Sequence, residues 1–236
     1  MAIPKILHYC WFGGEMRELD KKCVKTWEKF FQDFEWKKWD ESNFDVTVNE
    51  YVKQAYEAKR YQYVSDYARL LALYEHGGLY LDTDCEVRKS FEPLLSQTAF
   101  TGFGCDNKEI AACTLAFEPK NPFIKECLES YEKTAFIKED GTQDLRSINI
   151  RMTEILMKYG YQPNGKEQEI LGIHIYPMSY FCPLSLDLEH VKDCIGKDTY
   201  CIAKFDSEEF KRERRWYMKL GRALGLDKLK RKIKGK

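Results

Sequence analysis

The segment Gly77-Gly78-Leu79-Tyr80-Leu81-Asp82-Thr83-Asp84 constrains the fold more than any other part of this chain of 236 residues. Residues 61–76, which precede it, carry apolar side chains at three- and four-residue steps and therefore predict a helix that the glycine pair ends. The apolar residues that follow predict a strand over residues 79–87, interrupted by acids. A helix that turns at once into a strand with two aspartates indicates an α/β protein with a polar site at the edge of its sheet.

Helical and strand patterns alternate along the rest of the chain. Residues 3–12 form an apolar run closed by Gly13-Gly14, which predicts a first buried strand. We expect further helices over 19–31, 48–59, 122–131 and 151–159, further strands over 34–39, 99–103, 110–117, 172–177 and 199–205, and a polar loop over 138–147. This order predicts an α/β fold in which a mixed sheet is flanked by helices, with one domain over residues 1–210 and a tail over 211–236.

The net charge of zero conceals a strong asymmetry. The tail holds 12 Lys and Arg against 2 Asp and Glu, whereas residues 1–210 hold 26 against 36. Leucines and aromatic residues alternate with the basic residues of the tail, which predicts a basic amphipathic helix suited to an anionic membrane surface. A solvated helix that packs its leucines on the body is the alternative, and the acidic body argues against a nucleic-acid partner.

No stretch of the chain has the long apolar run of a membrane span or a signal peptide. We therefore expect a cytoplasmic protein that can associate peripherally with the inner face of the cytoplasmic membrane. The nine cysteines include no CxxC pair and no zinc-like spacing, so we expect them to be reduced and mostly in the core.

Asp82 and Asp84 are the candidate catalytic and metal-binding residues. A chain this rich in acids contains acid-x-acid pairs about six times by chance, so the pair is weak evidence without its context. Here both acids follow an apolar strand, and the two-residue period of a strand places their carboxylates on one side of the chain. Two hard oxygen ligands suit Mn²⁺ or Mg²⁺, with water and a diphosphate completing the coordination. Two solvated acids at a strand end are the alternative.

Three residues elsewhere are candidates for the same site. Asp66 and Arg69 lie three residues apart on one face of the predicted helix 61–76, so they form either an ordinary ion pair or a pair that faces the acidic strand end. Trp11 precedes Gly13-Gly14 and offers either a flat surface for a base or a core side chain.

Three blocks together carry a resemblance to a known family: residues 3–14 (IPKILHYCWFGG), residues 63–69 (YVSDYAR) and residues 77–84 (GGLYLDTD). They resemble the sugar-binding DXD glycosyltransferases, and more narrowly glycosyltransferase family 32, which includes bacterial capsular and surface polysaccharide enzymes. The resemblance is strongest over residues 1–90, continues loosely to about residue 206 and does not include the tail.

The resemblance implies a GT-A-like, Rossmann-related fold, a nucleoside diphosphate sugar donor, a divalent cation and transfer with retention of anomeric configuration. It implies that Trp11 stacks on the nucleobase, that Asp66 and Arg69 contact the donor sugar, and that Asp82 and Asp84 bind the metal and diphosphate. Tyr80 and Thr83 would lie beside the two acids in the donor site. Gly78 would belong to the turn that lets the strand start without a side-chain clash.

The chain departs from the family at two places. Many members carry a His near the end of the last core strand, where this chain reads Tyr200-Cys201-Ile202-Ala203-Lys204-Phe205-Asp206. Lys204 is then the candidate diphosphate ligand and Asp206 a candidate additional metal ligand. Residues 110–113 lack the Asn that the family often has there, which affects the expected acceptor contacts.

We therefore predict a metal-dependent hexosyltransferase that uses a nucleoside diphosphate sugar, expected to be a UDP-sugar. Its expected acceptor is a glycan, lipid-linked, in bacterial surface polysaccharide synthesis. A non-catalytic nucleotide-sugar-binding protein is the first alternative. A DxD phosphohydrolase is the second, although that class carries its motif on the first strand.

Overall fold

The computed structural model describes residues 2–183 and 195–204. Within them, one sheet contains β1 (Ile6–Cys10), β2 (Glu35–Trp39), β3 (Gly78–Leu81), β5 (Ala99–Gly102), β6 (Thr114–Phe117), β7 (Gln168–Ile170) and β8 (Ile173–Tyr176). The helices are α1 (Glu18–Trp27), α2 (Glu50–Glu57), α3 (Tyr61–His76), α4 (Pro122–Glu132) and α5 (Ile148–Met157), with a short 3-10 helix at Glu92–Leu94. β4 (Cys85–Val87) and β9 (Cys201–Ala203) form a separate antiparallel pair.

The large sheet is mixed, as the sequence predicts. Its strand order is β2-β1-β3-β6-β5-β8-β7. β1 runs parallel to β2 and β3, and β5 runs parallel to β8, whereas β6 is antiparallel to both of its neighbours. The predicted mixed α/β class is therefore confirmed.

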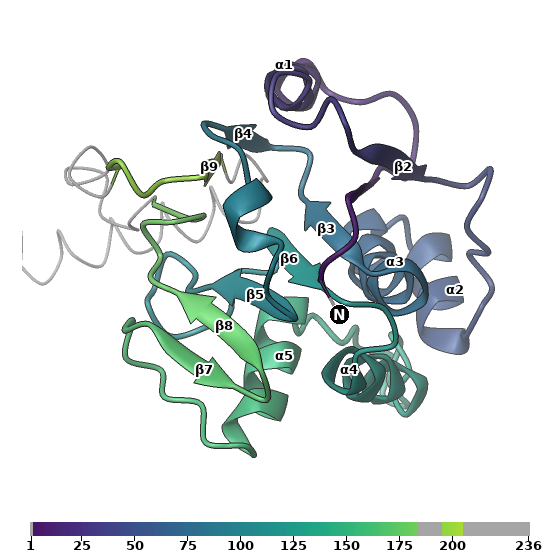
Figure 1. The fold of residues 1–236 in the computed structure, drawn as a ribbon. Coiled ribbons are helices and arrows are strands. Elements are labelled where there is room, and N and C mark those ends of the chain that lie inside the picture. The colour runs from purple at the N-terminus through teal and green to yellow at the C-terminus, as the bar shows by residue number, and fades with distance from the viewer. Residues whose placement is uncertain (1, 184–194, 205–236) are drawn as a thin grey trace, which may run out of the picture. The chain divides into compact units, whose positions relative to one another are not determined.

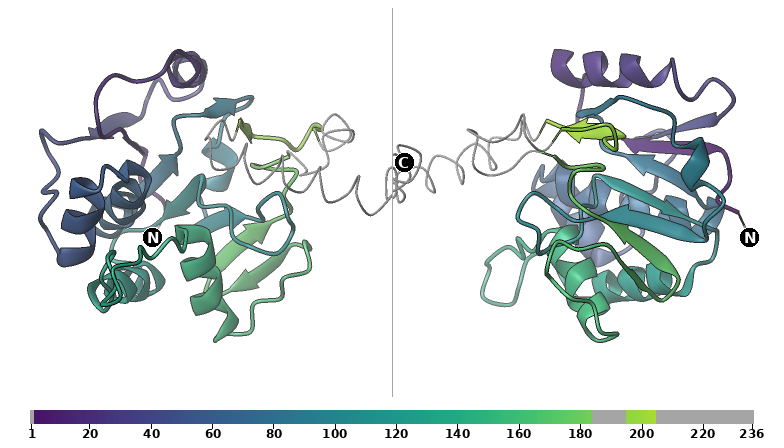
Figure 2. Two further views of the ribbon diagram at one scale, coloured as in Figure 1. Left: turned by 180° about the vertical axis from the view of Figure 1, so that it is seen from behind. Right: turned by 60° about the vertical axis from the view of Figure 1, so that its left-hand side comes forward.

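Helices α2 to α5 pack on one another, and α3 lies directly on β1, β3 and β6 (Figure 1). Helix α1 lies apart from these helices and packs on β4. Both views of Figure 2 show β4 and β9 side by side, away from the centre of the large sheet. The apolar face of α3 is enclosed by the core, because Val64, Leu70 and Leu73 are completely buried.

Two expectations about the strands were wrong. Residues 79–87 form two strands in different sheets, because the chain turns between them: the Cys85 N–H donates to the Asp82 carbonyl at 3.0 Å. Residues 168–170 form the edge strand β7, which the sequence analysis missed because its Gln-Glu-Ile run is short and polar.

The predictions about the tail and the domain boundary at residue 210 concern residues outside the described ranges and stay predictions. None of the helices within 2–183 and 195–204 combines the length and apolar character that crossing a bilayer requires. All eight cysteines in these ranges are free, and seven of them are buried, which agrees with the predicted reduced core thiols.

The turn from α3 into β3 is held by His8 on β1. The His8 Nε2–H donates to the Gly77 carbonyl at 2.8 Å, and the Trp39 indole N–H donates to His8 Nδ1 at 3.1 Å. Gly77 and Gly78 both have positive φ, at 64° and 107°. A Cβ at Gly78 would lie 2.5 Å from the Ile6 carbonyl oxygen, so the close approach of the turn to β1 requires glycine.

We predict that Gly78→Ala lowers the free energy of unfolding by about 2–4 kcal/mol, because it adds a clash with backbone to an unfavourable φ. Gly14→Ala is the matched control: Gly14 has a φ of 106°, and a Cβ there would meet nothing within 4 Å. The control should lose only about 1 kcal/mol. Urea unfolding measures the loss of unfolding free energy in both variants. Equal losses would show that the close approach of Gly78 to β1 does not by itself demand glycine.

We also predict a pH dependence of stability that originates at His8. Burial lowers the pKa of His8 from 6.5 to about 4, so between these values the native state binds fewer protons than the unfolded state. Stability is therefore full above pH 6.5 and falls as the pH falls towards 4, by about 3 kcal/mol in total. Melting temperatures of the wild type and His8→Gln between pH 7 and 4.5 should converge as the pH falls; parallel curves would contradict this role.

Candidate donor and metal site

A cleft lies at the carboxyl ends of β1 and β3. These strands are parallel neighbours, with Leu7 opposite Leu79 and His8 opposite Tyr80, so the segments that follow them emerge at the same edge of the sheet. The cleft has a volume of about 520 Å³. It is lined by Cys10, Trp11, Phe12, Gly13, Glu15, Arg17, Asp20, Tyr61, Gln62, Ser65, Arg69, Tyr80, Asp82, Thr83 and Asp84.

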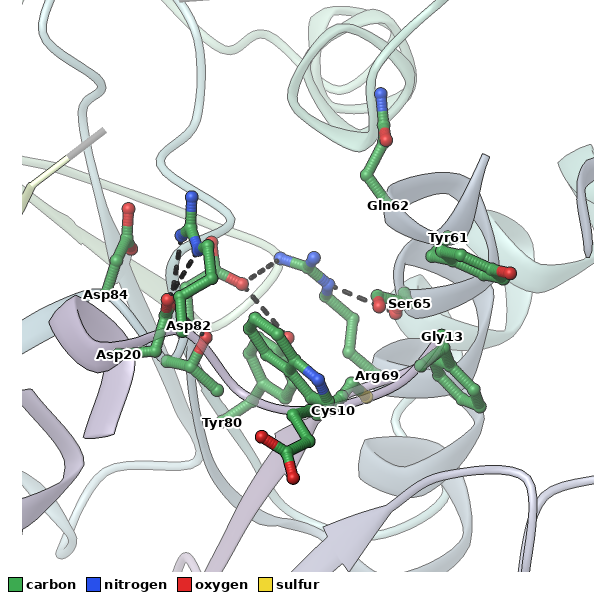
Figure 3. Close-up of a pocket in the computed structure, with 15 residues that line it drawn as sticks. Cys10, Gly13, Asp20, Tyr61, Gln62, Ser65, Arg69, Tyr80, Asp82 and Asp84 are labelled. Carbon is green, nitrogen blue, oxygen red and sulfur yellow. Dashed lines mark hydrogen bonds and ion pairs between the residues drawn. The ribbon is translucent and has the colours of Figure 1, made fainter. Parts of the chain in front are cut away.

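The two sides of the cleft differ in charge, as Figure 3 shows. Asp20, Asp82 and Asp84 lie on one side of the cleft, Tyr61 and Gln62 of α3 lie on the other, and the Arg69 side chain lies between them. The cleft therefore has one acidic wall and one wall of uncharged polar groups.

Arg69 joins three segments at the base of the cleft. Its guanidinium pairs with Asp66 on its own helix and with Asp82 after β3, each at 3.1 Å. It also donates to the Ala112 carbonyl at 2.9 Å and lies 4.5 Å from the centre of the Tyr80 ring. The Arg69 side chain is only 7% exposed, so these contacts replace its hydration.

Burial changes the pKa of both carboxyl groups that pair with Arg69. It raises the pKa of Asp66 to about 6, and the positive charge of Arg69 works in the opposite direction. Burial also raises the pKa of Asp82, again opposed by Arg69. The Ile148 N–H at the start of α5 donates to Asp66 at 3.3 Å, which ties the carboxylate to the N-terminal end of that helix.

The two acids that the sequence predicts as metal ligands lie on a turn. The Asp82 N–H donates to the Cys113 carbonyl at 2.9 Å, and the turn closes at Cys85. The expected two-residue strand period is therefore absent between Asp82 and Asp84, although both residues line the cleft. Tyr80 donates its hydroxyl to Asp82 at 3.0 Å and holds the carboxylate beside Arg69.

The donor set of the cleft fits a divalent cation that keeps most of its coordination outside the protein. Asp82 and Asp84 supply hard carboxylate oxygens, and the Asp82 side chain is 33% exposed. Within the described residues, no group of three or more His, Cys, Asp or Glu is arranged to hold a metal ion. Two carboxylates suit Mn²⁺ or Mg²⁺ bound together with water and a diphosphate.

Asp20 is a residue of the acidic wall that the sequence analysis missed. It is fully buried, accepts two hydrogen bonds from Arg17, at 2.6 and 3.1 Å, and accepts the Thr83 hydroxyl at 2.7 Å. A signal was present: Asp20, Cys23 and Trp27 share one helix face, and an acid in a buried apolar stripe marks a paired carboxylate. Asp20 thereby holds the turn that carries Asp82 and Asp84.

Trp11 contributes an aromatic side chain to the lining of the cleft. Its indole N–H donates to the Gly14 carbonyl at 2.9 Å, and the Arg17 guanidinium lies 6.0 Å from its ring centre. These contacts hold the indole at the cleft, where an aromatic base can stack.

The remaining predicted site residues lie elsewhere. Asp66 lies beneath the cleft, behind Arg69, and Gly78 is packed against β1 at the start of β3. Asp206 lies outside the described residues, and Lys204 is the last residue described, so their expected roles stay predictions. In the segment 110–113 the backbone supplies the contacts: Ala112 accepts from Arg69 and donates its N–H to Asn149 at 3.1 Å.

The comparisons with known proteins agree with this cleft. Residues 17–101 match the family model described as the glycosyltransferase sugar-binding region containing DXD motif. The resemblance to DXD glycosyltransferases is thereby confirmed, and the narrower family 32 assignment is consistent with it. The matched region includes α1, α3 and the acidic turn.

Two curated relatives come from Schizosaccharomyces pombe. Inositol phosphoceramide mannosyltransferase 3 is 28% identical over 139 residues, which is 57% of this chain and 39% of that protein. Inositol phosphoceramide mannosyltransferase 1 is 24% identical over 142 residues, 56% of this chain and 43% of that protein. The chain thus spans about two fifths of the length of these relatives. A solved structure, PaToxG glycosyltransferase, is 19% identical with a TM-score of 0.47 and covers 66% of this chain and 69% of its own.

We predict that Arg69→Met lowers the free energy of unfolding by about 3–5 kcal/mol, because it leaves Asp66 and Asp82 without their buried cation. Adding Asp66→Asn should restore part of this loss. Lys21→Met is the control, since the pair of Lys21 with Glu18 has the same three-residue spacing but is exposed, and it should change little. Equal effects of the two single substitutions in urea unfolding would contradict the central role of Arg69.

Proposed function

We propose that the protein is a metal-dependent glycosyltransferase that transfers a hexosyl unit from a nucleoside diphosphate sugar. The observation that carries the proposal is the meeting of Trp11, Arg69 and the Asp82–Asp84 turn in one cleft. An aromatic surface and two carboxylates in one cleft suit the base and the metal-bound diphosphate of a nucleotide-sugar. The match of residues 17–101 to a sugar-binding DXD region supports the same conclusion.

In this proposal Asp82 and Asp84 hold Mn²⁺ or Mg²⁺. When bound, the cation neutralises the charge that develops on the departing nucleoside diphosphate. Arg69 and Tyr80 orient the Asp82 carboxylate, and Asp20 orients the turn through Thr83. These contacts pre-organise the acidic wall, so little reorganisation is needed when the donor binds.

Ser65 and Gln62 line the wall opposite the acids and are suited to hydrogen-bond sugar hydroxyls. Asp66, which the resemblance assigns to the donor sugar, is proposed to act through Arg69, because their pairing places Asp66 beneath the cleft. Transfer with retention, by same-face attack guided by the leaving phosphate, is part of the proposal.

We further propose a UDP-sugar as donor and a lipid-linked glycan of a bacterial surface polysaccharide as acceptor. The names of the two yeast relatives specify a lipid-containing acceptor, which supports a lipid-linked acceptor for this protein. The same names specify a mannosyl group, so a GDP-sugar is the first donor to compare with the proposed UDP-sugar. Residues 211–236 are proposed to bind the anionic cytoplasmic face of a membrane through their basic residues.

The proposal predicts metal-dependent donor binding. In a thermal-shift panel of UDP-, GDP-, CMP- and dTDP-sugars with and without Mn²⁺, one nucleotide should stabilise the protein by about 3 kcal/mol at a hundredfold excess over its Kd. Asp84→Asn should abolish the Mn²⁺-dependent part and reduce donor hydrolysis about 100-fold or more. Glu139→Gln, at an exposed acid outside the cleft lining, is the control.

The alternatives to a metal-dependent glycosyltransferase each predict a different combination of donor binding and hydrolysis. Binding and hydrolysis that do not need metal would contradict the role of Asp82 and Asp84. Donor binding without hydrolysis or transfer would indicate a nucleotide-sugar-binding protein. Hydrolysis of simple phosphate esters without donor binding would indicate a phosphohydrolase.

A further inference from the structure

Arg17 is the more exposed of the two arginines that line the cleft in the described part of the chain. The same lining contains four acids. The Arg69 side chain is 7% exposed and is enclosed by its own partners, whereas the Arg17 side chain is 46% exposed. Because an acidic lining repels an anionic ligand, an accessible cation in the cleft determines where the negative charge of such a ligand can bind.

The Arg17 guanidinium is fixed by a buried carboxylate. Its Nε–H donates to one oxygen of Asp20 at 2.6 Å, and its Nη2–H donates to the other oxygen at 3.1 Å. The Asp20 side chain is only 1% exposed, so it cannot follow Arg17 into the solvent. Two parallel bonds to one rigid carboxylate set the plane and the direction of the guanidinium, and less side-chain entropy is then lost when Arg17 binds a ligand.

Arg17 adjoins both parts of the candidate donor site. The guanidinium lies 6.0 Å from the centre of the Trp11 ring. Its partner Asp20 accepts the Thr83 hydroxyl at 2.7 Å, and Thr83 stands between the two candidate metal ligands in the sequence. In a nucleotide-sugar the phosphates lie between the base and the sugar. A cation next to the aromatic surface and to the acidic turn is therefore placed for the diphosphate.

We propose that Arg17 binds the diphosphate of the donor directly, as a second cation beside the metal, and that Asp20 is the residue that positions it. This inference rests on the proposed function of the cleft. A guanidinium carries five N–H donors in a fork that matches phosphate oxygens, so it binds a phosphate while it stays paired with Asp20. The described lining of the cleft does not include Lys204, which the sequence suggests for this contact.

The same contact acts on the reaction. Negative charge grows on the diphosphate as it departs from the sugar, so its attraction to Arg17 increases in the transition state. Asp20 holds both Arg17 and the turn through Thr83, which keeps the arginine and the metal-binding carboxylates in one fixed arrangement. Loss of Arg17 should therefore reduce the rate of donor hydrolysis by a larger factor than it reduces donor affinity.

The test measures the binding of three ligands by calorimetry in the presence of Mn²⁺. They are the nucleoside, the nucleoside monophosphate and the nucleoside diphosphate of the base identified by the thermal-shift panel. We expect Arg17→Met to bind the diphosphate about 10- to 100-fold more weakly than the wild type and the nucleoside equally well. Lys21→Met, at an exposed pair with Glu18 on the same helix, is the control and should change neither affinity.

Two further variants separate binding from folding. Arg17→Met leaves the buried Asp20 without its cation, whereas the double variant Arg17→Met, Asp20→Asn removes that charge and keeps an oxygen for Thr83. The double variant should still bind the diphosphate weakly, and Arg17→Lys should regain part of the affinity because it keeps the charge. Equal weakening for all three ligands, or wild-type affinity of the double variant, would show that Arg17 only neutralises Asp20 and would overturn the inference.

The inference and the proposed function fail in different ways. Mn²⁺-dependent donor binding by the wild type, together with unchanged diphosphate affinity in Arg17→Met, would overturn the role of Arg17 alone, as would a loss confined to Lys204→Met. If no nucleotide binds, inorganic pyrophosphate with Mn²⁺ is the probe. Pyrophosphate binding that Arg17→Met weakens would support Arg17 and contradict the proposed donor, whereas a wild type that binds neither pyrophosphate nor nucleotide would overturn both.

Discussion

The buried guanidinium of Arg69 is the interaction on which the acidic edge of the sheet depends. A cation removed from water needs anions and hydrogen-bond acceptors around it, and Arg69 finds them in Asp66, Asp82 and the Ala112 carbonyl. These partners come from α3, from the end of β3 and from the segment before β6. Burial of one charge thus requires three parts of the chain to meet at one point.

A second constraint determines where that point lies. α3 ends at His76, and the chain reverses through two glycines with positive φ so closely against β1 that a Cβ at Gly78 would meet the Ile6 carbonyl. His8 holds the same turn through the Gly77 carbonyl. As a result β3 lies parallel to β1, and the loop after β1 and the turn after β3 share one edge.

The Asp82–Asp84 turn is therefore held from several sides. Arg69 and Tyr80 contact Asp82 from the core, and Asp20 reaches the turn through Thr83. The Cys113 carbonyl binds the Asp82 N–H, one residue after the carbonyl that Arg69 uses. The peptide segment 112–113 consequently connects the buried cation with the candidate metal ligands.

The sequence by itself determined the features that depend on neighbouring residues. Helix α3 begins and ends where its periodicity and the glycine pair predict, and the mixed α/β class follows from the order of apolar patterns. The turn at residues 82–84, the wall formed by Asp20 and the place of Asp66 beneath the cleft were decided only by the tertiary structure. The turn and the wall depend on partners in separate segments, such as Cys113 for Asp82 and Thr83 for Asp20, and Asp66 lies where it does because its neighbour Arg69 also pairs with the distant Asp82. Local patterns carry no information about which distant group will satisfy a buried charge.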